Sequence, residues 1–138
     1  MILEPDPLQV GQLSDEQQMY KENILDHYKH PHNKRVVSDS TYVLAGRNPL
    51  CGDAITVYVT VRDGSIEDVA FEGAGCAISQ ASMSMLTDEL KGKTLERLAA
   101  MGQDDIVTML GIPIGPVRMK CAMLGLRTTQ EAVAARRS

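Results

Sequence analysis

The chain of 138 residues is long enough for one domain, and its apolar content of 43% is sufficient for a hydrophobic core. A net charge of −4 argues against nucleic acid as the main partner, and no apolar run reaches the roughly 18 residues that a membrane-spanning helix needs. The first residues have no basic region before an apolar one, so we predict no signal peptide and a soluble, cytoplasmic protein. The chain has three cysteines, an odd number. In the reducing cytoplasm this favours metal binding or thiol chemistry over a disulfide framework.

The N-terminal part contains a strong signal for the start of a helix. Residues 1–13 include two prolines and are expected to form an irregular arm before a single domain at 14–138. Ser14, followed three residues later by Gln17, is typical of a capping box. We therefore predict a helix from there to about Lys29.

Three histidines, His27, His30 and His32, cluster where Pro31 should end this helix. Histidines this close in sequence can ligate a metal ion. They are also favoured at a helix C-terminus, where the backbone carries a partial negative charge. Because Pro31 disturbs a regular ligand spacing, we prefer the second interpretation.

Three strands are predicted next. They are 41–45, 54–61 and 65–72, with a loop at 46–53 between the first two. Asp63-Gly64 is a two-residue hairpin signal between the second and third strands. Ile66 and Val69 fall on opposite parity along the third strand, which indicates a bulge near Glu67 or Asp68.

The rest of the chain is predicted to be helical. The expected helices are 77–91, 94–101, 103–110 and 116–135. Strands and helices are therefore segregated along the chain, which is typical of an α+β fold. We predict a small three-stranded antiparallel sheet with helices packed on one face.

Every cysteine lies in a short segment where secondary structure should begin or end. These segments are 48–53, 73–79 and 118–124. A hairpin returns the chain to where it began, so Cys51, before one strand, and Cys76, after its partner, should meet at one end of the sheet. The spacing does not place Cys121. We interpret the three cysteines, with Asp53, as a four-ligand metal or iron–sulfur site.

Three thiolates and one carboxylate suit tetrahedral Zn²⁺ or an iron–sulfur cluster. Helix N-termini favour thiolates, as expected for Cys76 and Cys121, and Arg118 and Lys120 flank the latter. A carboxylate such as Asp53 exchanges more easily than a thiolate, which suits a site that must release what it binds. The alternative is three buried, inert cysteines and an aspartate in a turn.

At these segments the sequence resembles the IscU/SufU family of iron–sulfur cluster assembly proteins, which are NifU N-terminal-like. The matching segments are Asp26-His27-Tyr28 with Pro31 and Asn33, then 48–53, 75–82 and 118–122. The resemblance implies the family's α+β fold and a cysteine desulfurase as sulfur donor, with downstream acceptor proteins. It also implies Cys51, Asp53, Cys76 and Cys121 as ligands of Zn²⁺ or of a transient [2Fe–2S] cluster.

The third segment is similar to SufU-type members, because Lys120 stands where IscU-type members have histidine. The connection from 92 to 116 is short, as in IscU-type members. The resemblance therefore leaves two functions open. One is a scaffold with Cys121 as persulfide acceptor. The other is a zinc-dependent sulfurtransferase in which Cys51 attacks the persulfide and Arg118 stabilises it. A structural zinc domain that mediates protein contacts is a third possibility.

Overall fold

The structure is a computed structural model that describes residues 13–49 and 52–134. Most of the predicted N-terminal arm, residues 1–12, lies outside these ranges. The elements in chain order are α1 (Asp15–Lys29), β1 (Tyr42–Asn48), β2 (Asp53–Arg62), β3 (Ser65–Ala74), α2 (Ala77–Leu90), α3 (Leu95–Ala100), α4 (Gln103–Leu110) and α5 (Pro116–Ala134).

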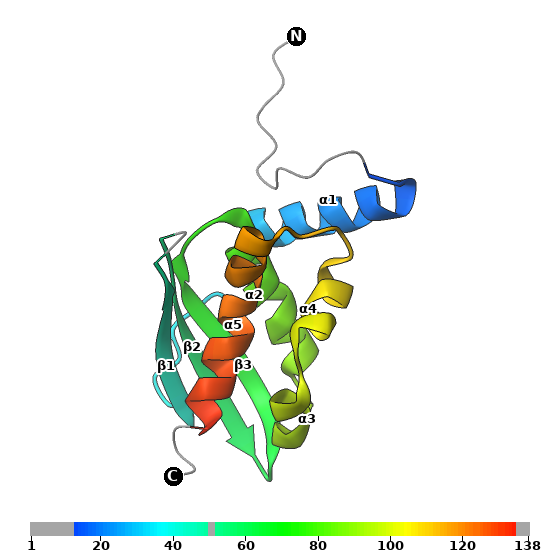
Figure 1. Ribbon diagram of the computed structural model, residues 1–138. Coiled ribbons are helices and arrows are strands. Elements are labelled where there is room, and N and C mark those ends of the chain that lie inside the picture. Colours follow the sequence, from blue (N-terminus) through cyan, green and yellow to red (C-terminus); the bar gives the residue numbers. More distant parts are fainter. Residues whose placement is uncertain (1–12, 50–51, 135–138) are drawn as a thin grey trace.

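The strands form one antiparallel sheet in the order β1-β2-β3, and the helices pack against one face of it (Figure 1). Helix α5 contacts β1 and β2, α2 contacts β3, and the two helices pack against each other. Their contact layer contains fully buried side chains such as Phe71, Ile78, Leu86 and Leu126. The predicted α+β class is therefore confirmed.

The hairpin between β2 and β3 confirms both local predictions made for it. Asp63 and Gly64 both have positive φ, at 54° and 77°, as a two-residue type I′ turn requires. Thr60 pairs with Asp68, whereas the next residue, Val61, pairs with Ile66. Glu67 is therefore the extra residue of a bulge, which returns the Ile66 side chain to the core.

The predicted loop at 46–53 is wrong at both ends. Strand β1 continues to Asn48 and β2 begins at Asp53, and these two residues pair with each other. Gly46, which suggested a loop, lies inside β1 because helix α5 crosses there. A Cβ atom at this position would overlap the Thr128 hydroxyl. The glycine is thus explained by close packing and not by a turn.

All of the predicted helices form. At the start of α1, Gln17 N donates to Ser14 Oγ at 3.2 Å and Ser14 N donates to Gln17 Oε1 at 3.1 Å, which completes the capping box. Helix α2 is buried along most of its length and lies at the centre of the helical layer. Within the described residues, no helix is long and apolar enough to span a bilayer.

Candidate metal centre

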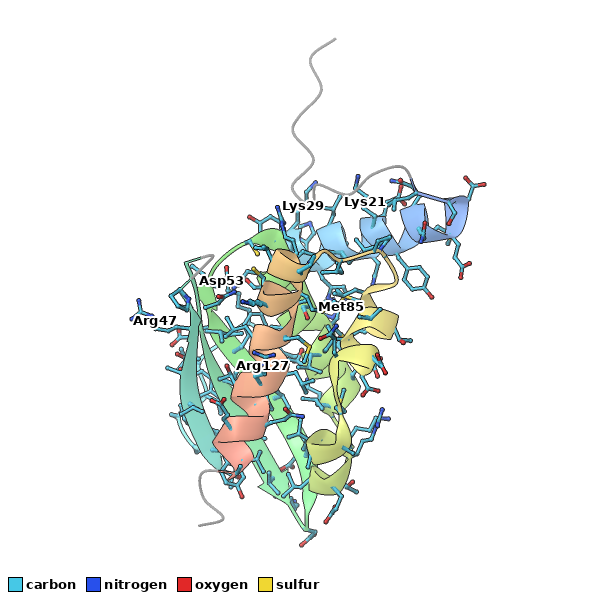
Figure 2. The ribbon with its side chains drawn as sticks, viewed as in Figure 1. Lys21, Lys29, Arg47, Asp53, Met85 and Arg127 are labelled. Atoms are coloured by element: carbon cyan, nitrogen blue, oxygen red, sulfur yellow. The ribbon has the colours of Figure 1, made fainter. Side chains whose placement is uncertain are left out.

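Three of the four predicted ligands come together at one end of the sheet. Asp53 is the first residue of β2, Cys76 is the N-cap residue of α2, and Cys121 lies in the second turn of α5. One ligand atom from each lies within 4.8 Å of the other two. Figure 2 shows Asp53 at this end of the sheet, beside the first turns of α5.

Asp53 is fixed by the start of helix α2. Its Oδ1 accepts a hydrogen bond from the backbone N–H of Cys76 at 2.8 Å, and its Oδ2 lies 4.0 Å from Cys76 Sγ. The side chain is only 2% exposed. A buried carboxylate needs such a partner, so the helix start orients Asp53 and leaves its second oxygen beside the thiol.

Gly75 allows the chain to pass close to this carboxylate. A Cβ atom at Gly75 would clash with Asp53 Oδ1 and would lie 2.7 Å from Ser79 Oγ. Ser79 in turn donates to the backbone oxygen of Cys76 at 3.1 Å. The glycine before Cys76 is therefore required by packing around the candidate ligands.

Cys121 is fully buried, and Asn48 donates to it. The Asn48 amide nitrogen lies 3.6 Å from Cys121 Sγ, and Asn48 is itself buried at the end of β1. A donor aimed at sulfur favours the thiolate. Cys76 lies at the N-terminus of α2, as expected. Cys121 lies in the second turn of α5, beyond the first turn to which the field of a helix N-terminus extends, and its Sγ lies 3.8 Å from the backbone oxygen of Val117.

The other residues that the sequence assigned to the site or its flanks are Cys51, Arg118 and Lys120. Cys51 lies outside the described residues. Arg118 is half-buried in the first turn of α5, and Lys120 is exposed. The described residues alone therefore contribute one carboxylate and two thiols, a donor set that fits Zn²⁺ or an iron–sulfur cluster.

Comparison with known proteins decides the family. The sequence profile of the NifU-like N-terminal domain matches residues 19–138. The chain belongs to this family.

Relatives in the NifU-like family carry two kinds of description. The zinc-dependent sulfurtransferase SufU of Bacillus subtilis is 37% identical, over 84% of this chain and 90% of its own length. The iron–sulfur cluster assembly scaffold protein IscU 1 of Archaeoglobus fulgidus is 35% identical, over 83% of this chain and 74% of its own. A putative assembly scaffold protein for the SUF system from Fervidobacterium islandicum superposes with a TM-score of 0.67 at 30% identity, covering 85% of this chain and 98% of its own.

A polar groove of about 210 Å³ adjoins the centre of this NifU-like domain, between β1 and α5. Arg47, Lys120 and Arg127 contribute cations to its lining, and Asn48 is shared with the centre. Figure 2 shows Arg47 and Arg127 on these two elements. Sequence reasoning missed this groove, because it did not place α5 against β1. It also assigned no role to Asn48 or Gly75, although both stand in the cysteine segments.

The histidines lie at the end of α1, as expected, but they do not form one group. His27 is buried and its ring stacks obliquely on that of His32, with centroids 4.4 Å apart. His30 is the C-cap residue, and its backbone N–H donates to Asp26 O. Burial and the neighbouring His32 lower the pKa of His27, which favours the neutral imidazole.

Proposed function

We propose that this NifU-like domain is an iron–sulfur cluster assembly scaffold. The observation that supports this most strongly is the convergence of Asp53, Cys76 and Cys121 from three separate elements to within 4.8 Å. Relatives described as assembly scaffolds match most of the chain. The cluster is cargo in this function, received, held briefly and passed to an acceptor protein.

In this proposal Cys51, Asp53, Cys76 and Cys121 are the ligands. Asn48 and the backbone N–H of Cys76 hold two of them in place through the contacts described above. Asp53 supplies the ligand that exchanges most readily, so the site can release its cargo. Cys76 is half-buried, which leaves one side of the centre open to a partner.

A cysteine desulfurase is the proposed sulfur donor. A thiolate of this chain attacks the outer sulfur of the donor's persulfide. A new S–S bond forms, the donor's S–S bond breaks, and the donor's thiolate leaves. Cys121 was expected to accept this sulfur, but its side chain is fully buried, so an approach to it needs a conformational change. Its burial favours a role as ligand. We propose Cys51 as the acceptor, because the resemblance to SufU-type members assigns it the attack on the persulfide, with Arg118 to stabilise the persulfide anion.

A zinc-dependent sulfurtransferase is the second candidate function. The Bacillus subtilis relative carries this description, and Lys120, which is exposed beside Cys121, agrees with SufU-type members. Bound Zn²⁺ would hold the thiolates and protect them from oxidation. The residues would be the same four, with sulfur transfer in place of cluster assembly as the outcome.

Metal and acid-labile sulfide in the anaerobically purified chain separate these functions. Iron with matching sulfide, held more firmly after Asp53→Ala, supports the scaffold. Zinc without sulfide, together with faster alanine production by a cysteine desulfurase, supports the sulfurtransferase. Zinc without any effect on the desulfurase supports a structural zinc domain. Absence of metal, with no uptake of added zinc or iron, would rule out the four-ligand site.

A further inference from the structure

His27, His32 and Asp88 form a second group of metal-ligating side chains, which shares no residue with the cysteine centre. They come from the end of α1, the segment after it, and the last part of α2. One ligand atom from each lies within 4.8 Å of the other two. The sequence suggested histidine ligands here but gave no reason to add Asp88, which is 56 residues away from His32.

Hydrogen bonds orient both imidazole rings of this group. His32 Nδ1 lies 2.6 Å from Asp88 Oδ2, and His27 Nδ1 lies 2.7 Å from Ser84 Oγ. Ser84 Oγ also accepts the backbone N–H of His32 at 2.7 Å. Ser84 is not one of the three candidate ligands, and an outer partner of this kind fixes the orientation of a ligating histidine at metal sites. The contact between His32 and Asp88 brings two of the candidate ligands together.

The carboxylate is held as well. Asn33 Nδ2 donates to Asp88 Oδ1 at 3.1 Å and to Thr87 Oγ1 at 2.8 Å. His27 is buried, whereas the side chains of His32 and Asp88 are 48% and 47% exposed. The group is therefore anchored on its inner side and open to solvent on its outer side, so an ion can enter and water can complete its coordination.

We propose that His27, His32 and Asp88 bind a divalent transition-metal ion of the Zn²⁺, Co²⁺ or Ni²⁺ class. Imidazole nitrogens with one carboxylate suit these ions, and the absence of thiolates from the group distinguishes it chemically from the cysteine centre. The bound ion would join the C-terminal end of α1 to α2. The proposal does not depend on the function proposed for the cysteine centre.

Metal content after equilibrium dialysis of the tag-free chain against Zn²⁺ tests the proposal. Wild type should retain one more zinc than the cysteine centre holds, and Zn²⁺ should raise its melting temperature. His32→Ala should lose the additional zinc and the increase in melting temperature. Asp88→Asn should weaken its binding by about tenfold or more. His30→Ala, which changes a neighbouring histidine outside the group, should behave as wild type.

Two results would overturn the proposal. One is that wild type binds no zinc beyond that removed by Cys76→Ser. The other is that His32→Ala and Asp88→Asn, both folded by circular dichroism, retain the additional zinc with wild-type affinity. If His32→Ala does not fold, Asp88→Asn alone decides, because its amide keeps the shape of the carboxylate and removes the charge.

Discussion

At the scale of single residues, the candidate centre depends on a position that has no side chain. Gly75 lies against the Asp53 carboxylate and Ser79, and both of these contact Cys76. The close approach lets a backbone N–H reach the carboxylate, which keeps a buried acid oriented toward the thiols.

Gly75→Ala should therefore displace Asp53. We expect the equilibrium affinity for Zn²⁺, which would use this carboxylate as a ligand, to fall by about 10–100-fold, and the free energy of unfolding to fall by about 1–3 kcal/mol. Competition with a chelator and urea denaturation measure the two effects. Gly102→Ala is the control, since nothing lies within 4 Å of a Cβ atom there. Equal affinity in both variants would show that Gly75 has no part in the site.

Much of the centre could be predicted from the sequence at this scale, and the reasons are physical. A hairpin must return the chain to its start, so we expect Cys51 and Cys76 at the same end of the sheet. Cys51 lies outside the described residues, but Asp53, two residues after it, contacts Cys76 at this end. Cys121 could not be placed by this reasoning, because its position depends on how α5 crosses the sheet. The one sign of that crossing in the sequence is Gly46, which leaves room for Thr128 of α5. From the sequence alone we interpret this glycine as part of a loop.

At the scale of elements, Asn33 joins α1, β3 and α2. Its backbone oxygen accepts the N–H of Phe71 at 3.0 Å, and its side chain contacts Thr87, Asp88 and Lys91. Its φ of 59° lies in the left-handed region, which asparagine tolerates better than most residues. The Pro31 and Asn33 part of the N-terminal signature therefore has a structural explanation: it turns the chain from α1 onto the edge of the sheet.

Asn33→Gly should lower the free energy of unfolding by about 2 kcal/mol, since three side-chain hydrogen bonds are lost. Asn33→Ala should cost more, because a Cβ atom disfavours the left-handed conformation while the same bonds are lost. Urea denaturation of both variants measures this. Asn23→Ala, at an exposed position of α1, is the control. A smaller loss for alanine than for glycine would contradict the role of backbone conformation.

At the scale of the whole molecule, one ion-pair network joins the segment after α1 to the sheet and to the end of α2. Asp68 accepts from Arg35 at 2.6 Å and lies 3.4 Å from Lys91 Nζ. Partial burial raises the pKa of Asp68, but the hydrogen bonds and charges of Arg35 and Lys91 outweigh this effect, and the pKa lies below its usual value.

The lowered pKa of Asp68 predicts the direction in which stability changes with pH. The folded state holds the proton of Asp68 less tightly than the unfolded state, so the stabilisation is present above the unfolded value of 3.8 and is lost as pH falls through the lower folded value. Asp68→Asn should cost at most about 1 kcal/mol near neutral pH, as expected for a partly exposed pair, and less in acid. Urea denaturation from about pH 7 to about pH 3 measures this. Asp39→Asn, an exposed change, is the control. A cost for Asp68→Asn that grows in acid would contradict the sign.

The scaffold function is tested most directly by iron and acid-labile sulfide bound to the chain after anaerobic incubation with a cysteine desulfurase, free cysteine, ferrous iron and dithiothreitol, the thiol that reduces persulfide sulfur to sulfide. We expect equal amounts of iron and sulfide in wild type and in Gly102→Ala, with loss of both in Cys76→Ser and in Cys121→Ser. Wild type without bound sulfide, or cysteine variants that retain as much iron and sulfide as wild type, would contradict a cluster held at this centre.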